Sequence, residues 1–168
     1  MKHICATLLL FCSIETTEQD FIQSIKECAI KWNAMSMEQD RIPINLVLAQ
    51  SIIESNWGKS RFAKKANNFF GIKAMEGEEH ILSKNKKKIK SYHTKCDSVN
   101  DYMDLLSFGE PYKEFKEELI RQWAIDRIDI YAMIEYLENY AEDKKYKIKL
   151  KKIIKQLERV NYGNTKGD

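Results

Sequence analysis

Apolar residues recur at helical spacing along most of the chain, and they predict its helices in order. The first stripe places four residues on one helix face: Phe21, Ile25, Cys28 and Trp32. We expect this helix to begin at about Thr17, whose hydroxyl can cap the first turn. Glu18 and Asp20 then lie in the first turn, where the helix dipole favours negative charge. The polar stretch from 36 to 41 predicts a loop after this helix.

The second predicted helix is apolar on nearly every side. Residues 44–53 are mostly aliphatic, and a helix without a polar face has to be buried. Pro43 suits the first position of this helix, because that position needs no backbone N–H donor. Gly58 predicts the end of the helix as its C-cap. A short helix capped by Ser60 is expected to follow and to run to Ala66.

Helical spacing is absent between residues 69 and 95 and returns beyond Asp97. The later stripes are Val99, Tyr102, Met103 and Leu106; then Tyr112, Phe115 and Leu119; then Ile130, Ile134, Leu137 and Ala141; and finally Leu150, Ile154, Leu157 and Val160. Gly109 and Pro111 separate the first two of these. The whole pattern predicts a bundle of about six or seven helices.

The stretch without helical spacing predicts a β-hairpin. Residues 80–82 and 89–92 have the composition of short strands, and 84–88 form the turn between them. Lysines dominate this turn. We interpret it as the solvent-exposed tip of the hairpin, and the alternative is a cationic contact with an anionic polymer.

The start of the chain has the pattern of an export signal. Met1-Lys2-His3 is a short basic region, and residues 4–14 are almost wholly apolar. This apolar stretch is too short to span a bilayer, which takes about 20 residues. We therefore predict a cleaved signal over 1–15, a catalytic domain over 16–162 and a flexible tail over 163–168. The alternative for the start is a buried N-terminal helix.

Composition and charge limit the class of protein. The length of 168 residues fits one domain, and an apolar fraction of 43% is typical of a globular chain. The net charge of +3 is smaller than nucleic-acid binding usually requires, so we expect no nucleic-acid partner. No Cys/His cluster predicts a metal. Cys28 and Cys96 lie outside the predicted signal. Export would permit them to pair, but a buried free thiol at Cys28 fits its apolar stripe as well.

Glu54 is the candidate for acid chemistry. It lies at the end of the buried helix, where burial disfavours the carboxylate anion and raises the pKa. The negative partial charge of the helix C-terminus acts in the same direction. A carboxyl group that stays protonated near neutral pH can protonate the leaving oxygen of a glycosidic bond. Position alone favours an exposed glutamate at a helix end over a catalytic one, so the neighbouring segments decide.

Four segments carry a family resemblance. In chain order they are ESNWGKS (54–60), NNFFGIK (67–73), SYHTKCDSVNDY (91–102) and YAEDKKY (140–146). Each is short, but four in the same order are hard to obtain by chance. Over residues 43–160 the chain resembles the glucosaminidases of glycoside hydrolase family 73, which are relatives of the lysozyme-like fold.

The resemblance implies a fold, an activity and a set of site residues. The implied fold is α+β and predominantly α-helical: a lysozyme-like helical domain with a small β-hairpin lobe. The implied activity is that of an endo-β-N-acetylglucosaminidase, a peptidoglycan hydrolase that cleaves the bond from N-acetylglucosamine to N-acetylmuramic acid. Glu54 matches the catalytic glutamate of the family. The expected substrate-binding residues are Asn67, Asn68, Tyr92 and Tyr140. No cofactor or metal is implied.

Several of these residues also have a structural interpretation. Asn67 and Asn68 fit a turn as well as a binding site. Tyr92 and Tyr140 each offer an aromatic face and a hydroxyl to a sugar, but Tyr92 fits a core position equally well. Tyr102 is expected in the core.

The chain departs from the family where a second carboxylate is expected. Two-carboxylate glycosidases pair the acid with a second Asp or Glu. Many family members carry that acid in a T-x-EY-like strand, where this chain reads ILSK over 81–84. Glu78 and Glu79, which adjoin the predicted strand, are therefore our candidates. Alternatively, the acetamido group of the substrate acts as nucleophile, and Glu54 works as a single general acid.

The expected partner is a peptidoglycan glycan strand, bound by an exported monomer in the periplasm or cell envelope or outside the cell. We expect no membrane-spanning segment in the mature chain. One alternative is a muramidase or lytic transglycosylase on the same fold. However, FGIK at 70–73 replaces the GLMQ-like segment of those enzymes. A non-catalytic wall-binding module is the alternative from another class.

Overall fold

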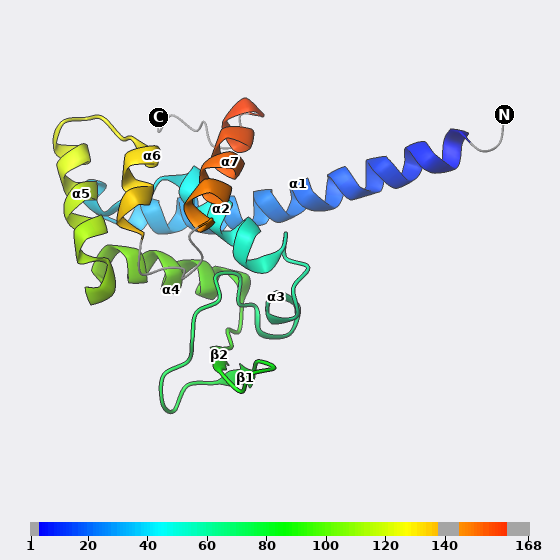
Figure 1. The fold of residues 1–168 in the computed structure, drawn as a ribbon, viewed down its shortest axis with the longest axis horizontal. Helices are drawn as coiled ribbons and strands as arrows, with labels where there is room; N and C mark the ends of the chain where they lie inside the picture. Colours follow the sequence, from blue (N-terminus) through cyan, green and yellow to red (C-terminus); the bar gives the residue numbers. More distant parts are fainter. Residues whose placement is uncertain (1–3, 138–144, 161–168) are drawn as a thin grey trace.

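The fold is described from a computed structural model, which covers the backbone of residues 4–137 and 145–160 and the side chains from residue 17 onward. The described residues form seven α-helices: α1 Ile4–Met35, α2 Ile44–Ser55, α3 Arg61–Ala66, α4 Lys95–Phe108, α5 Lys113–Ala124, α6 Ile130–Met133 and α7 Tyr146–Arg159. Three 3₁₀ turns (η1 Glu38–Asp40, η2 Glu110–Tyr112, η3 Ile134–Tyr136) and two strands (β1 His80–Leu82, β2 Lys88–Lys90) complete them (Figure 1). The predicted class, helical with a small hairpin lobe, is confirmed.

The buried helix predicted from residues 44–53 is α2. It packs against α1 on one side and α7 on another. Leu46, Val47, Leu48 and Ala49 are completely buried, in agreement with a helix that has no polar face. Because burial of these side chains fixes α2, its last turn gives Glu54 a rigid support.

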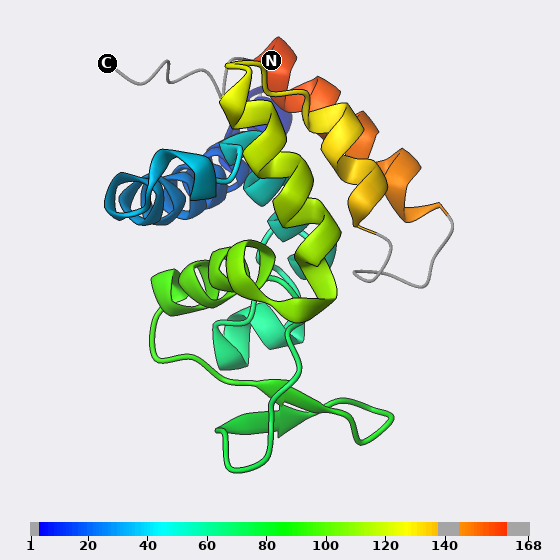
Figure 2. The same cartoon turned by 90° about the vertical axis from the view of Figure 1, so that its left-hand side faces the viewer.

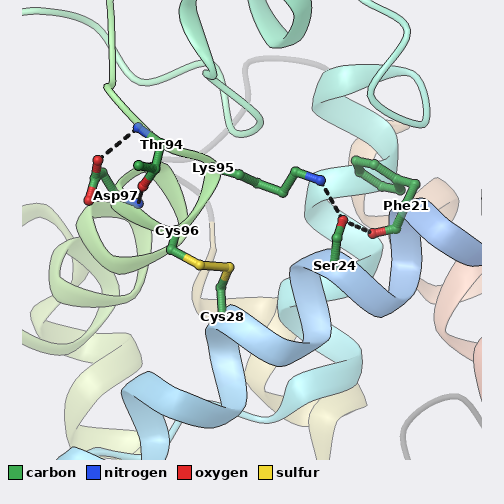
Figure 3. Close-up of a disulfide and its surroundings, with 7 residues drawn as sticks. All are labelled: Phe21, Ser24, Cys28, Thr94, Lys95, Cys96 and Asp97. Atoms are coloured by element: carbon green, nitrogen blue, oxygen red, sulfur yellow. Dashed lines mark hydrogen bonds between the residues drawn. A yellow bond between two sulfur atoms is a disulfide. The ribbon is translucent and has the colours of Figure 1, made fainter.

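A disulfide joins α1 to α4. Cys28 and Cys96 are bonded, with their Cα atoms 5.1 Å apart (Figure 3). Sequence analysis left a buried free thiol at Cys28 as an equal alternative, and the structure decides for the pair. A bond across 68 residues stabilises the fold mainly by restricting the unfolded chain.

The start of α4 is fixed in two further ways beside this disulfide. Thr94 and Asp97 form a capping box, in which each side chain accepts a hydrogen bond from the other residue's backbone N–H. Lys95 Nζ donates to Ser24 Oγ on α1 at 2.6 Å (Figure 3). The helix therefore begins at Lys95, whereas the sequence analysis expected helical structure to return only beyond Asp97.

The first helix begins earlier than predicted. α1 is continuous from Ile4, so Thr17 lies inside it and does not cap its start. Among the α1 side chains that the structure describes, from residue 17 onward, the buried ones begin at Phe21. Figure 1 shows the N-terminal half of α1 extending away from the other helices. Thr17 has no capping role, because the helix continues through it toward the N-terminus. The export signal over 1–15 and the domain limits stay predictions. No helix among the described residues combines the length and apolar character needed to cross a membrane.

The ends of α2 also differ from prediction. Pro43 is the residue before the helix rather than its first residue, and the predicted loop after α1 contains the 3₁₀ turn η1. The helix ends at Ser55, and Asn56 takes the left-handed C-cap conformation with φ 49° that we assigned to Gly58. Asparagine tolerates this conformation better than most residues. Ser60 caps α3 as predicted, since its side chain accepts a hydrogen bond from the Ala63 backbone N–H.

The hairpin lobe lies at one end of the molecule, beyond α3 and α4 (Figure 2). β1 and β2 are antiparallel, with His80 opposite Lys90. β2 begins one residue before the predicted start and ends two residues before the predicted end. Residues 84–88 are all exposed, in agreement with a solvated hairpin tip.

The third of the later stripes does not form one continuous helix. α6 ends at Met133 and is followed by η3, in which the helix tightens. Ala141, the last residue of that predicted stripe, lies outside the described residues. α7 buries the first three residues of the final stripe, Leu150, Ile154 and Leu157, but the fourth, Val160, follows the helix end and is exposed.

Candidate active site

A cleft of about 350 Å³ opens between the helices and the hairpin lobe. The described residues that line it come from α2, the segment after α3, β2, α4 and η2: Glu54, Phe70, Gly71, Ile72, Lys73, Met75, Glu78, Lys90, Asp101, Leu105 and Tyr112. Three carboxyl groups face this cleft, two from the helices and one from the lobe segment.

Glu54 lies half-buried in the last turn of α2. Burial raises the pKa of its carboxyl group above the usual 4.5, and a hydrogen bond from Tyr146 opposes the shift without cancelling it. Glu54 in turn acts on Tyr112, whose pKa rises to about 12 because the phenol is buried and faces the Glu54 charge. The protonated form of Glu54 is therefore favoured, as the sequence argument from helix burial expects.

A chain of hydrogen bonds holds Glu54 from behind. Tyr102 Oη donates to Gln50 Oε1, and Gln50 Nε2 donates to Tyr146 Oη at 2.9 Å. Tyr146 completes the chain with its hydrogen bond to Glu54. Tyr102 and Gln50 are completely buried, so the expected core position of Tyr102 is confirmed. Because Tyr102, Gln50 and Tyr146 are buried, these hydrogen bonds restrict the rotation of the half-buried Glu54 side chain.

Gly71 lets the backbone pass close to Glu54. Its φ is +70°, a left-handed conformation that residues with a Cβ rarely adopt. A Cβ placed there would lie 3.4 Å from Glu54 Oε2. Glycine therefore suits position 71 because of its backbone conformation. The missing side chain also leaves space beside the Glu54 carboxyl group.

Asn68 builds the turn that presents Gly71. Its side chain is 1% exposed. Its Oδ1 accepts hydrogen bonds from the backbone N–H groups of Phe70 and Ile72, and its Nδ2 donates to the carbonyl oxygens of Ile72 and Lys90. All four of these hydrogen bonds are with backbone groups, so Asn68 stabilises the turn, as the structural interpretation of this residue expects. Its contact with a sugar stays a prediction.

Asn67 and Tyr92 lie at the edge of the lobe and do not line the cleft. Asn67 Nδ2 donates to the carbonyl oxygens of Tyr92 and His93, both at 3.0 Å, and Asn67 itself is the left-handed C-cap of α3. Tyr92 Oη donates to Asp101 Oδ2 at 2.7 Å, and burial together with this acceptor raises the pKa of the phenol. Both residues shape the cleft through their neighbours, and their direct contact with substrate stays a prediction.

The two candidates for a second carboxylate differ in position. Glu78 lines the cleft, whereas Glu79 is exposed and does not. Lys90 Nζ contacts Glu78 Oε1 at 2.7 Å. Hydrogen bonds from Lys90 and from the Met75 backbone N–H hold the pKa of Glu78 below 4.5. Tyr140, the remaining predicted site residue, lies outside the described residues.

Sequence reasoning did not select four of the residues that face or support Glu54. Asp101, Lys90 and Tyr112 line the cleft, and Tyr146 holds Glu54 from behind. Asp101 belongs to the DSVNDY segment and Tyr146 ends the YAEDKKY segment, so the segments themselves were the available signal. No three His, Cys, Asp or Glu side chains come close enough to hold a metal ion in the part of the chain that the structure describes.

Comparisons with known proteins identify the family of this chain. The Glucosaminidase family model, described as mannosyl-glycoprotein endo-beta-N-acetylglucosaminidase, matches residues 31–159. Exo-glucosaminidase LytG of Bacillus subtilis is 26% identical over 156 residues, which cover 86% of this chain and 53% of LytG. Protein bax of Escherichia coli is 29% identical over 113 residues, which cover 67% of this chain and 41% of bax. The chain therefore spans about half the length of these relatives.

Solved structures show the same fold. The catalytic domain of the autolysin Auto from Listeria monocytogenes has a TM-score of 0.65 and 25% identity, and the match covers 88% of each chain. The glycoside hydrolase domain of FlgJ from Salmonella typhimurium has a TM-score of 0.64 and 25% identity, and it covers 86% of this chain and 90% of that domain. Since the family model extends over most of the chain, from α1 to the end of α7, this protein belongs to the glucosaminidase family.

Proposed function

We propose that this chain is a peptidoglycan hydrolase that cleaves the bond from N-acetylglucosamine to N-acetylmuramic acid, with Glu54 as general acid. One observation carries the proposal: a half-buried glutamate with a raised pKa lies on a cleft, at the end of a rigid buried helix. Family membership and the name of LytG, an exo-glucosaminidase, support the class of bond. The name of FlgJ, a peptidoglycan hydrolase, supports the substrate.

The proposed chemistry begins with proton transfer. Glu54 donates its proton to the glycosidic oxygen as the bond to the sugar carbon breaks. Positive charge then develops on the sugar, as in an oxocarbenium ion. The side-chain carboxyl groups of Glu78 and Asp101, on the same cleft, stabilise that charge. Water completes the hydrolysis.

Glu78 is the residue we assign as the second carboxylate. It lines the cleft and its pKa is held low, whereas Glu79 is exposed and outside the lining. Two carboxyl groups whose environments move their pKa values apart suit an acid and an anion working together. If the acetamido group of the substrate is the nucleophile instead, Glu78 serves only to stabilise charge.

We also propose that the protein works outside the cytoplasm. The Cys28–Cys96 disulfide supports this location, because such bonds persist in oxidising compartments. The apolar sequence of residues 4–14 supports an export signal.

The test is a digest of purified peptidoglycan, reduced with borohydride and read by mass spectrometry. Glu54→Gln is run in parallel, and Glu117→Gln, an exposed residue of α5, is the matched control. We expect reduced N-acetylglucosamine ends from the wild type and the control. Loss of the general acid should lower turnover by about 10²–10⁴-fold.

Other products would change the assignment. Reduced or anhydro N-acetylmuramic ends would indicate a muramidase or a lytic transglycosylase. If folded wild-type protein released no new ends from several wall types, the chain would be a wall-binding module and the proposed function would be wrong.

A further inference from the structure

A single ammonium group lies between two carboxylates on the cleft wall that the hairpin lobe and α4 form. Lys90 Nζ contacts Glu78 Oε1 at 2.7 Å and Asp101 Oδ2 at 2.9 Å. The three residues come from three places: the segment before β1, β2 itself and α4. Since both carboxylates contact the same nitrogen, they lie within two hydrogen-bond lengths of each other.

Two carboxylates this close are difficult to keep ionised together. Like charges at such a distance raise the pKa of one partner, which then takes up a proton. The ammonium group removes this conflict by contacting both. Burial alone would lower the pKa of Lys90, but its hydrogen bonds to Glu78 and Asp101 outweigh burial and raise it. The lysine therefore stays charged between the two carboxyl groups.

We propose that Lys90 is a positioning residue that holds the carboxyl groups of Glu78 and Asp101 side by side and so maintains a negative wall on the cleft of Glu54. This inference rests on the proposed function, because a negative wall matters where positive charge develops on a sugar. Lys90 also links the lobe to α4, so it fixes where the two carboxylates lie. It touches neither the proton donor nor, in this account, the scissile bond.

The other charged and titratable groups near this wall leave the assignment unchanged. Tyr92 Oη donates to the same Asp101 oxygen, and its ring lies 5.5 Å from Lys90 Nζ. Lys73 lines the same cleft and is exposed, and Glu54 and Tyr112 face it from the helices. Among the residues that the structure describes, the ion pairs of Glu78 and Asp101 are both with Lys90.

The experiment compares Lys90→Met with Lys90→Arg, and Lys88→Met is the matched control. Lys88 lies on the same strand as Lys90, but it is exposed and does not line the cleft. The Lys88→Met substitution removes the same positive charge as Lys90→Met. The side-chain carboxyl carbons of Glu78 and Asp101 are titrated by ¹³C NMR in each folded variant, and the pH profile of kcat/KM is measured on purified wall.

In Lys90→Met we expect one of the two carboxyl groups to titrate at a higher pH than in the wild type. The acidic limb of kcat/KM should move to higher pH with it, so that turnover on that limb falls by roughly tenfold. Lys90→Arg and Lys88→Met should keep the wild-type titrations and the wild-type limb. A purely structural lysine would lower the melting temperature in Lys90→Met and leave both titrations in place.

Two results would overturn the proposal. One is unchanged titration of Glu78 and Asp101 in folded Lys90→Met. The other is a shifted titration without any movement of the acidic limb in an active enzyme. If the wild type turns over no wall, the proposed function fails by itself, and the NMR titration alone then decides whether Lys90 positions the two carboxyl groups.

Discussion

The two sides of the cleft control the charge of a glutamate in opposite ways. On the helical side, α2 places Glu54 against the core, and burial raises the pKa of its carboxyl group. On the lobe side, Glu78 lies in a more open segment, and hydrogen bonds from Lys90 and the Met75 N–H lower its pKa. The same side chain is thus favoured as an acid in one place and as an anion in the other, which is what a glycosidase requires.

This difference follows from the kind of structure on each side. At the end of the buried helix α2, burial is the largest influence on the pKa of Glu54. The lobe has little core of its own, and Lys90 has charged partners on two neighbouring segments. Burial therefore controls the pKa of Glu54 on the helical side, and the Lys90 ion pair controls the pKa of Glu78 on the lobe side. A substitution can change one of these effects without the other.

Removing the negative charge at Glu78 should have the largest effect on this comparison. We expect Glu78→Gln to lower kcat by about 10²-fold if Glu78 is the second carboxylate. The matched control is Glu79→Gln, which removes the neighbouring exposed carboxylate and should retain wild-type turnover. Rates are measured on purified wall at the wild-type pH optimum. Equal, near-wild-type rates for both variants would instead favour the acetamido group of the substrate as nucleophile.

A methyl group at Gly71 should disturb the Glu54 side of the cleft. Gly71→Ala forces a left-handed conformation on alanine, at a cost of about 1–2 kcal/mol in the free energy of unfolding. Its Cβ would also lie 3.4 Å from Glu54 Oε2. Gly77→Ala is the control, because φ there is +85° and nothing lies within 4 Å of its Cβ.

Urea unfolding and turnover separate the two consequences of these alanines. Both variants should lose similar stability, and Gly71→Ala should lose more activity. Equal activity in the two variants would show that the close approach to Glu54 has no catalytic importance.

The hydrogen bond from Tyr146 should produce the smallest effect, a shift in pH dependence. This bond lowers the pKa of Glu54, so Tyr146→Phe should raise it further. The alkaline limb of kcat/KM reports loss of the proton from the general acid, and it should therefore move to higher pH. Movement to lower pH would contradict the direction assigned to this hydrogen bond. Tyr131→Phe, which removes an exposed hydroxyl bonded to Glu158, is the control.

The sequence predicted the parts of this account that depend on one element at a time. Apolar residues on every side of 44–53 predict a buried helix. The same pattern predicts that burial raises the pKa of a carboxyl group at the end of this helix. Serine before a short helix is enough to predict the cap at Ser60. The family segments then identified Glu54 among many glutamates.

The parts that the sequence did not predict depend on contacts between elements far apart in the chain. Lys90 meets Asp101 across 11 positions and a change from strand to helix, and Gln50 meets Tyr146 across 96 positions. The Cys28–Cys96 pair is of the same kind, since spacing alone allows a disulfide or a free thiol. The helix end at Asn56 rather than Gly58 is a local failure, because asparagine and glycine both accept the left-handed conformation.

The central claim is that burial raises the pKa of Glu54 while hydrogen bonds lower the pKa of Glu78 across the same cleft. The most direct measurement is a ¹³C NMR titration of the glutamate carboxyl carbons in the wild-type protein, with the two signals assigned from Glu54→Gln and Glu78→Gln. The account predicts that Glu54 titrates above 4.5 and Glu78 below it. A Glu54 titration at or below 4.5 would contradict it, because the cleft would then lack a carboxyl group favoured as a proton donor.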